Sequence, residues 1–404
     1  MIYQAYQASV DALVPLRTFS QMFAPIWDHG GGGPTNYFTR NAAAFCHIIN
    51  IATLTHQRRA FGIGSVKVGT KEVPVQEIES CKTPFCTLLH FKKDIKTIQP
   101  KVLIVAPMSG HFSTLLRETV RTMLLDHDVY ITDWHNARDI ALTHGPFGMD
   151  EYIEHLIQFL TFLGPKNHLV AICQPCVPAL AAVALMSEDK HEATPASLSL
   201  LAGPIDCRIG PTEVNKLATS KPIEWFEKNL IDRVPACHPG AGRRVYPGFI
   251  QIAAFMNMNK ERHTQSLRNY YLNLIKGDQD SAQATRSFYE EYFAVTDLPA
   301  EFYLETVKLV FQEYALPLGK LQWRGRPINP GAIRRTMLLT VEGEKDDICA
   351  LGQTLAAHDL CHKLPLYRHT HYIEAGVGHY GVFSGKRWNN HIYPILRENI
   401  HDSG

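Results

Sequence analysis

The segment 169–186 places a cysteine where an apolar strand meets an apolar helix. Leu169 to Ile172 is a short apolar run, Gln174 and Pro175 interrupt it, and an alanine-rich stretch follows. Cys173 stands at this junction, beside the predicted start of the helix, where unpaired backbone N–H groups stabilise negative charge. A free thiol titrates at roughly 8.5 and reacts as the thiolate. The position therefore favours a nucleophilic cysteine.

A cysteine nucleophile needs a base that takes and returns its proton, and the base needs a partner that orients it. Asp346 and His379 each follow a predicted strand downstream of Cys173. This chain order of nucleophile, acid and histidine is similar to that of α/β-hydrolases. We therefore predict Cys173, Asp346 and His379 as the catalytic residues, and prefer Asp346 over the adjacent Asp347.

The residues around Cys173 resemble the G-x-S-x-G elbow of α/β-hydrolases, with cysteine in place of serine and neither glycine present. In that fold two backbone N–H groups stabilise the oxyanion of the tetrahedral intermediate. The expected donors are the N–H of Gln174 and that of Met108 or Ser109, in the loop after the strand ending at Val105.

Several of these residues have structural alternatives. A cysteine at a strand end is usually a small buried apolar residue, and Cys176 is expected to pack in the helix. Cys173 and Cys176 also form a C-x-x-C motif, but thiol–disulfide oxidoreductase sites normally lie in domains of about 100 residues. Asp347 is expected to face solvent or to cap a helix beginning near Ile348.

No metal site and no nucleotide site are expected. His358, His362, His369 and His371 lack a recognisable ligand spacing on one element. The last two also precede the final predicted strand, at the end of the sheet away from Cys173. The tract Gly30–Gly33 lacks the Lys-Ser/Thr ending of a phosphate loop.

Composition places the chain among globular proteins. Of its 404 residues 45% are hydrophobic and 20% are charged, and the formal net charge is +1. Without a basic run, nucleic-acid binding is disfavoured. The start of the chain has no secretory signal pattern, and no window has the roughly 18 apolar residues of a membrane helix. Nine cysteines without framework spacing favour a reducing cytoplasm.

Short apolar strands alternate with helix-length segments from Lys101 onward, which predicts a mostly parallel sheet covered by helices. The expected strands are 102–105, 129–132, 169–172, 198–202, 337–341 and 372–375, with edge strands in Phe61–Pro74. Residues 206–330 interrupt this rhythm and are interpreted as an inserted helical cap, with helices in Gly248–Ile275 and Asp280–Tyr314. The core domain then comprises 1–205 and 331–404, with an N-terminal extension of about 1–95.

Five segments together resemble the intracellular polyhydroxyalkanoate depolymerases. They are M-I-Y-Q-A-Y-Q-A at the start, P-M-S-G-H-F-S-T-L-L-R at 107–117, A-I-C-Q-P-C-V-P at 171–178, E-G-E-K-D-D-I-C at 342–349 and G-V-G-H-Y-G-V-F-S-G at 376–385. The resemblance implies an α/β-hydrolase fold and a carboxylic ester hydrolase that cleaves stored poly(3-hydroxybutyrate) through Cys173, Asp346 and His379.

The same resemblance implies the partners of the reaction. The substrate is the polyester, as polymer, granule surface or 3-hydroxybutyrate oligomers, and the location is cytoplasmic and granule-associated. No resident cofactor is expected, although coenzyme A could replace water as the acyl acceptor. The oligomeric state stays open.

Two other functions also stay open. Polyester synthases have a similar cysteine elbow that resembles G-x-C-x-G, and the missing glycines favour the depolymerase here. A non-catalytic granule-binding protein would instead hold polyester through the aromatic side chains of the cap.

Overall fold

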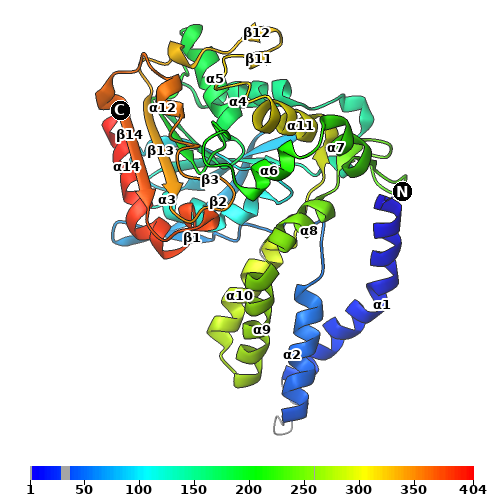
Figure 1. Ribbon diagram of the computed structural model, residues 1–404. Helices are drawn as coiled ribbons and strands as arrows, with labels where there is room; N and C mark the ends of the chain where they lie inside the picture. Colours follow the sequence, from blue (N-terminus) through cyan, green and yellow to red (C-terminus); the bar gives the residue numbers. More distant parts are fainter. Residues whose placement is uncertain (1, 29–36, 259) are drawn as a thin grey trace.

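A nine-stranded sheet forms the centre of the molecule (Figure 1). The computed structural model describes residues 2–28, 37–258 and 260–404. The strands of the sheet are β1 (Ser65–Val68), β2 (Lys71–Lys82), β3 (Cys86–Lys93), β4 (Lys101–Val105), β5 (Asp128–Trp134), β6 (Asn167–Ile172), β7 (Ser197–Leu201), β13 (Met337–Gly343) and β14 (His369–Glu374). Their spatial order is β1-β2-β3-β5-β4-β6-β7-β13-β14.

The sheet is antiparallel at one edge and parallel elsewhere. The pairs β1–β2, β2–β3 and β3–β5 are antiparallel, and every neighbouring pair from β5 to β14 is parallel. Every residue of β6, β7 and β13 is buried, as expected for parallel strands covered on both faces. The main covering helices are α3 (Arg117–Met123), α4 (Met149–Leu163), α5 (Cys176–Glu188) and α14 (Tyr393–Asp402). This is the predicted α/β-hydrolase fold.

The expected strands are present, with one wrong boundary. The final strand begins at His369, not at Tyr372, so that His369 and His371 lie within it rather than before it. The Thr340 hydroxyl on β13 is 2.8 Å from His371 Nδ1 and 2.8 Å from His358 Nε2. Because these polar groups satisfy one another, the strand needs no apolar run at its start. The edge strands expected in Phe61–Pro74 are confirmed as β1 and the beginning of β2.

A long segment with mostly helical structure lies between β7 and β13. It contains α6 (Glu213–Thr219), α7 (Ile223–Leu230), β8 (Asp232–Arg233), β9 (Arg244–Tyr246), α8 (Gly248–Met258), α9 (Lys260–Lys276), α10 (Gln279–Tyr292), β10 (Leu298–Pro299), α11 (Ala300–Glu305), β11 (Gln322–Trp323) and β12 (Arg326–Pro327). The expected helical stretch Asp280–Tyr314 is interrupted at β10, where Pro299 cannot donate a helical hydrogen bond. The assignment of 206–330 as a separate cap domain stays a prediction.

Two N-terminal helices, α1 (Ile2–Asp28) and α2 (Tyr37–Ile51), project from the sheet together with α9 and α10 (Figure 1). The hydroxyl of Tyr271 on α9 donates to Asn41 Oδ1 on α2 at 2.7 Å. The tract Gly30–Gly33 lies outside the described residues. Of the helices that the structure describes, none combines the length and apolar character needed to cross a membrane.

The opening residues anchor this projection to the body of the protein. Tyr3 is fully buried, and its hydroxyl donates a hydrogen bond to Asp297. The ring of Tyr6 stacks on Phe249 at a centroid distance of 4.0 Å. These contacts give the opening M-I-Y-Q-A-Y-Q-A segment a structural role, because the two tyrosines join α1 to the insertion.

Candidate active site

Cys173 occupies a tight turn between β6 and α5. Its φ is +66°, a left-handed conformation that costs a non-glycine residue about 1–2 kcal/mol. Hydrogen bonds hold the turn on both sides: the Cys173 N–H donates to Leu201 O on β7 at 2.8 Å, and its carbonyl accepts from the Cys176 N–H at 3.0 Å. The side chain is half-buried at the carboxyl end of the parallel strands. This is the strand–turn–helix corner predicted from the sequence.

Asp346 and His379 meet beside this turn. The Nδ1–H of His379 donates to Asp346 Oδ2 at 2.8 Å, and both side chains are buried. The other oxygen, Oδ1, accepts from the backbone N–H groups of Ile348 and Cys349 at 2.8 and 2.9 Å. Hydrogen bonds to both oxygens therefore fix the Asp346 carboxylate. Because His379 uses Nδ1 for this contact, its other ring nitrogen, Nε2, points away from the carboxylate.

Asp347 has a different place from its neighbour. Its side chain is exposed, as one of the two expectations for it stated. The other expectation, a cap for a helix beginning near Ile348, is wrong: the next helix, α12 (Ala357–Leu360), begins nine residues later, and the capping of the turn is done by Asp346 itself. The carboxylate that contacts His379 is thus the one that the sequence favoured, Asp346.

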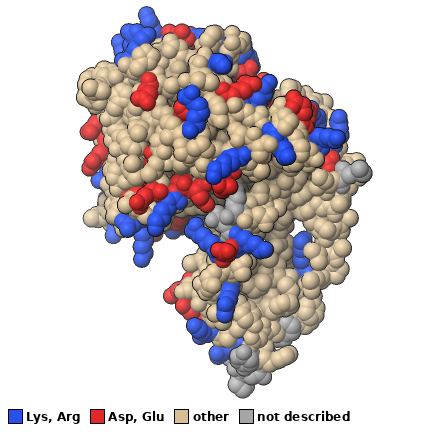
Figure 2. All heavy atoms as spheres, in the orientation of Figure 1, with Lys and Arg blue, Asp and Glu red and all other residues tan. Residues whose placement is uncertain are grey.

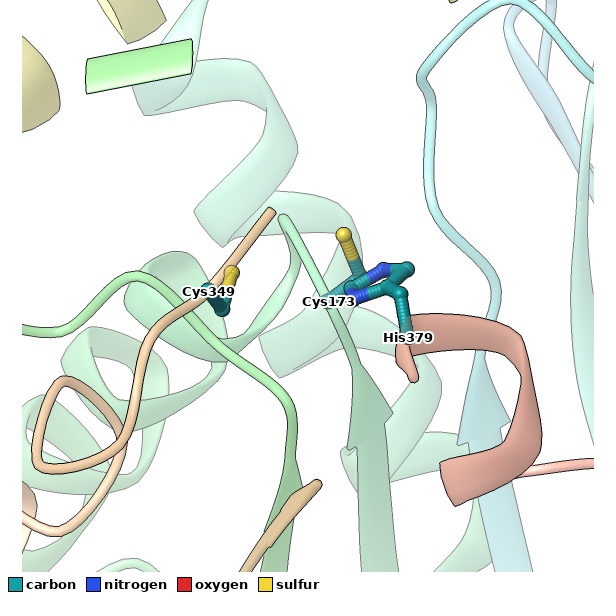
Figure 3. Close-up of side chains that lie close together, drawn as sticks. All are labelled: Cys173, Cys349 and His379. Carbon is teal, nitrogen blue, oxygen red and sulfur yellow. The ribbon is translucent and has the colours of Figure 1, made fainter. Parts of the chain in front are cut away.

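A second cysteine completes the cluster. Cys349 Sγ, Cys173 Sγ and a ring nitrogen of His379 all lie within 4.8 Å of one another, and Figure 3 shows the three side chains on separate segments of the chain, with His379 at the start of a short helix. Cys349 is buried. The sequence analysis did not predict it as a site residue, and its place within the E-G-E-K-D-D-I-C segment was the one available signal.

The cluster stabilises the charged form of Cys173. A hydrogen bond from the Cys349 thiol lowers the pKa of Cys173, burial opposes this effect, and His379 lowers the pKa further. Burial alone would lower the pKa of His379, but the Asp346 carboxylate and the Cys173 thiolate outweigh burial and hold it above its usual range. The two shifts together favour a thiolate–imidazolium pair near neutral pH.

Cys176 packs away from this pair. It is fully buried, and its Sγ contacts the carbonyl oxygens of Ala171 and Leu201 at 3.4 and 3.7 Å. Burial raises the pKa of its thiol well above the usual range. An inert thiol directed at backbone carbonyls matches the expected packing role and disfavours a C-x-x-C redox pair.

The structure brings two of the three expected oxyanion donors together. The Met108 N–H donates to the side-chain oxygen Oε1 of Gln174 at 3.3 Å, so that the Gln174 carboxamide bridges the two loops that carry these residues. Within the described chain, the backbone N–H of Gln174 has no protein acceptor. Ser109 follows on the same loop, but the contact across the site comes from Met108. The oxyanion role of all three residues stays a prediction.

A cavity of about 370 Å³ opens beside His379. Its walls come from α8, α9 and α10 and from the loops after β13 and β14. The lining residues are Phe255, Arg262, His263, Ser266, Ala284, Thr285, Phe288, Tyr289, Tyr292, Asp347, Ile348, His379 and Tyr380. A larger hollow of about 1020 Å³ lies between the end of α5 and the start of β13, and none of the predicted site residues lines it. The smaller cavity is therefore the candidate substrate site.

The histidines considered as metal ligands form a separate group. His358 Nδ1 lies 2.6 Å from His369 Nδ1, and His358 and His371 both contact the Thr340 hydroxyl. The other ring nitrogen of His369, Nε2, contacts Leu364 O at 3.0 Å, whereas His371 Nε2 has no hydrogen-bond partner among the described residues. His362 contacts the backbone instead, with its Nδ1 3.2 Å from Leu360 O. Among the residues that the structure describes, the cluster able to offer three close donor atoms is Cys173, Cys349 and His379.

Comparison with known proteins identifies the family. A family model described as the PHB (poly(3-hydroxybutyrate)) de-polymerase C-terminus matches residues 202–404, which is half of the chain. The chain belongs to the PHB depolymerase family. As a member of this family with an α/β-hydrolase fold, it is a hydrolase that acts on esters. A search of curated proteins finds no match.

Several solved structures are distantly similar to this chain. One is the 2-hydroxy-6-oxo-6-phenylhexa-2,4-dienoate hydrolase of Rhodococcus sp. strain RHA1, with 12% identity and a TM-score of 0.43 over 81% of this chain and 99% of that one. Another is the α/β-hydrolase GrgF of Penicillium sp. sh18, with 15% identity and a TM-score of 0.44 over 82% of this chain and 98% of that one. A third is DcsB in complex with its substrate analogue, with 14% identity and a TM-score of 0.45 over 82% of this chain and 99% of that one. Likenesses this distant carry no argument about function. The fold is established by the strand order of the chain itself.

Proposed function

We propose that this protein cleaves the ester bonds of poly(3-hydroxybutyrate), with Cys173 as nucleophile, His379 as general acid and base, and Asp346 as the residue that orients His379. One observation carries the proposal. Cys173, at φ +66° on a strand–turn–helix corner, lies beside His379, and the Nδ1–H of His379 donates to the buried Asp346 carboxylate at 2.8 Å. Membership of the PHB depolymerase family supports the choice of substrate.

In the first half-reaction the thiolate of Cys173 attacks the ester carbonyl carbon, and a C–S bond forms as the carbonyl electrons move onto oxygen. The tetrahedral intermediate then collapses, and the bond to the alkoxide of the next monomer breaks. The imidazolium of His379 gives its proton to that alkoxide, which leaves as a hydroxyl end. The products are a thioester on Cys173 and a shortened polymer.

In the second half-reaction neutral His379 takes a proton from water, and the resulting hydroxide adds to the thioester carbonyl. The C–S bond breaks, the thiolate of Cys173 returns, and His379 is again protonated. The released product is 3-hydroxybutyrate or an oligomer with a carboxyl end. Coenzyme A could accept the acyl group in the same way, giving a new thioester in place of the acid.

The oxyanion of each intermediate would lie between the N–H groups of Gln174 and Met108. The Gln174 carboxamide accepts the Met108 N–H, so that it must rotate away for this donor to act. Removal of one oxyanion donor commonly costs about 3–4 kcal/mol, which makes this rotation significant for the rate.

The polymer would enter through the cavity beside His379. Its aromatic walls include Phe288, Tyr292 and Tyr380, which suit a chain of esters and methyl groups. The helices α8, α9 and α10, which form most of these walls, belong to the 206–330 insertion. We assign that insertion the role of a cap over the catalytic residues.

Granule association is the proposed location. The helices α1 and α2 project from the body and expose apolar side chains, among them Met22 at 63%, Phe38 at 77% and Phe45 at 60% exposure. In the view of Figure 2, few charged side chains lie over α1 and α2, whereas several lie over α9 and α10. An apolar, weakly charged projection suits a polyester surface better than it suits water.

The decisive experiment is intact-mass measurement after brief exposure to an ester of 3-hydroxybutyrate. The wild type should gain the mass of one acyl group, and Cys173→Ala should gain none and should release no 3-hydroxybutyrate from native granules. Cys176→Ala is the matched control and should keep both properties, because its thiol points away from the site. An active Cys173→Ala protein would refute the assignment.

A further incubation separates depolymerase from synthase. With 3-hydroxybutyryl-CoA alone, we expect no polymer. Growth of polymer with release of coenzyme A would instead assign the triad to the building direction. For granule association, Phe38→Ser with Phe45→Ser should reduce co-sedimentation with granules while activity on a soluble ester stays intact.

A further inference from the structure

We propose that Cys173, Cys349 and His379 form a binding site for a thiophilic divalent cation, zinc above all, and that the bound ion holds the enzyme in a reversibly inactive state. The binding part of this inference depends on geometry alone. The inhibitory part rests on the proposed function, because it requires Cys173 and His379 to be catalytic. The sequence did not predict the site, since 176 residues separate Cys349 from Cys173 along the chain.

The donor atoms have nearly the spacing that zinc needs. Cys173 Sγ, Cys349 Sγ and a His379 ring nitrogen lie within 4.8 Å of one another. In a tetrahedral site with Zn–S near 2.3 Å and Zn–N near 2.0–2.1 Å, neighbouring donors lie roughly 3.5–3.8 Å apart. The three groups need to approach by about 1.0–1.3 Å at most, which small side-chain rotations can provide. A disulfide between the sulfurs would need a much larger approach, to about 2.05 Å.

The surroundings of the donors are already those of a metal site. Ligating histidines usually donate their second ring N–H to a carboxylate, which fixes the ring. His379 does this through Nδ1 to Asp346 Oδ2, and so its Nε2 is available for a metal. The same carboxylate accepts the backbone N–H of Cys349, so that it positions two of the three donors. Figure 3 shows the three donor side chains on separate segments of the chain.

The chemistry of the donors selects the ion. Two thiolates and an imidazole favour zinc and similar soft or borderline ions over magnesium and calcium, which prefer oxygen ligands. Three protein donors leave a fourth position, which would face the cavity beside His379 and hold water.

Binding must release protons. Starting from the thiolate–imidazolium pair, the ion displaces one proton from His379 and one from the Cys349 thiol, and both go to solvent. The ion then occupies the sulfur lone pair that would attack the ester and the nitrogen that would protonate the leaving group. Zinc and ester are therefore expected to compete, and a chelator should restore activity.

The test uses cobalt(II) as a spectroscopic probe on the full chain. We expect one Co²⁺ per chain with thiolate-to-cobalt absorption in the near ultraviolet, and displacement of this absorption by Zn²⁺. Cys349→Ser should weaken cobalt affinity by at least about 100-fold, because loss of an outer partner of a ligand alone costs about 10–100-fold. Cys237→Ser removes an exposed thiol outside the cluster and should bind as the wild type does.

The outcomes separate the two proposals. If Cys349→Ser, shown to be folded by circular dichroism, binds cobalt as tightly as the wild type with the same absorption, the site is refuted. Absence of cobalt binding in an enzyme that hydrolyses esters refutes the site and leaves the proposed function intact. Cobalt binding by a protein that forms no acyl adduct on Cys173 refutes the proposed function and, with it, the inhibitory part alone.

Discussion

Replacement of Asp346 by asparagine should reveal how His379 is used. In the wild type, Oδ1 of Asp346 accepts two backbone N–H groups and Oδ2 accepts the Nδ1–H of His379. An asparagine has one acceptor oxygen, which the two backbone donors are expected to retain. Its NH₂ group then faces His379 Nδ1. This nitrogen must become an acceptor, and the ring proton moves to Nε2, the nitrogen that serves Cys173.

The expected loss is large because His379 can then neither take the proton of Cys173 nor carry a stabilised positive charge. A buried triad with the wrong tautomer loses about 10⁴-fold in kcat. The Cys349 thiol still stabilises some thiolate, so we expect a loss of about 10³–10⁴-fold, equal to about 4–5.5 kcal/mol in the barrier. The assay is kcat and kcat/KM on a soluble 3-hydroxybutyrate ester at neutral pH, with a near-ultraviolet circular dichroism spectrum as a check on folding.

Two comparisons make the result decisive. The loss should shrink at alkaline pH, because an unassisted thiol ionises at roughly 8.5. Asp347→Asn changes the exposed neighbour, which lines the cavity mouth, and should alter KM more than kcat. A folded Asp346→Asn protein that loses less than about tenfold in kcat would show that His379 does not depend on this carboxylate.

Three further predictions follow from the same contacts. The first concerns pH: the reactive pair needs Cys173 ionised, with its pKa lowered to about 5, and His379 protonated, with its pKa raised. A plot of kcat/KM against pH should therefore rise through about 5 and fall above the raised pKa of His379. An acid limb near 8–9 would contradict the thiolate–imidazolium pair. Gln174→Ala removes the carboxamide that competes for the Met108 N–H but keeps the backbone donor, so kcat should stay within about threefold; a loss of ~10²–10³-fold would mean that the carboxamide itself stabilises the oxyanion. Buried Glu342 accepts three backbone N–H groups of the loop after β13, and Glu342→Gln should lower the free energy of unfolding by about 1–3 kcal/mol in urea titrations, whereas an unchanged midpoint would argue against this anchor.

Much of the fold could be predicted from local pattern. The apolar runs at 102–105, 169–172 and 337–341 predicted buried parallel strands because strands covered on both faces need continuous apolar side chains. The elbow was equally local: one polar break between such a strand and an alanine-rich helix marks a turn. The final strand was misplaced because its first residues, including His369 and His371, are polar and satisfied by partners on other elements.

The sequence by itself determined the alternation of strands and helices, the corner at Cys173 and the order in which an acid and a histidine follow it. The sequence only favoured Asp346 over Asp347, and the tertiary structure brings the Asp346 carboxylate to His379. The tertiary structure alone decided that the Gln174 carboxamide accepts the Met108 N–H and that Cys349 joins the cluster. The physical reason is range. Strand and helix periodicity depends on neighbours in the chain, whereas the direction of a side chain in a loop depends on the distant backbone groups that bind and pack against it.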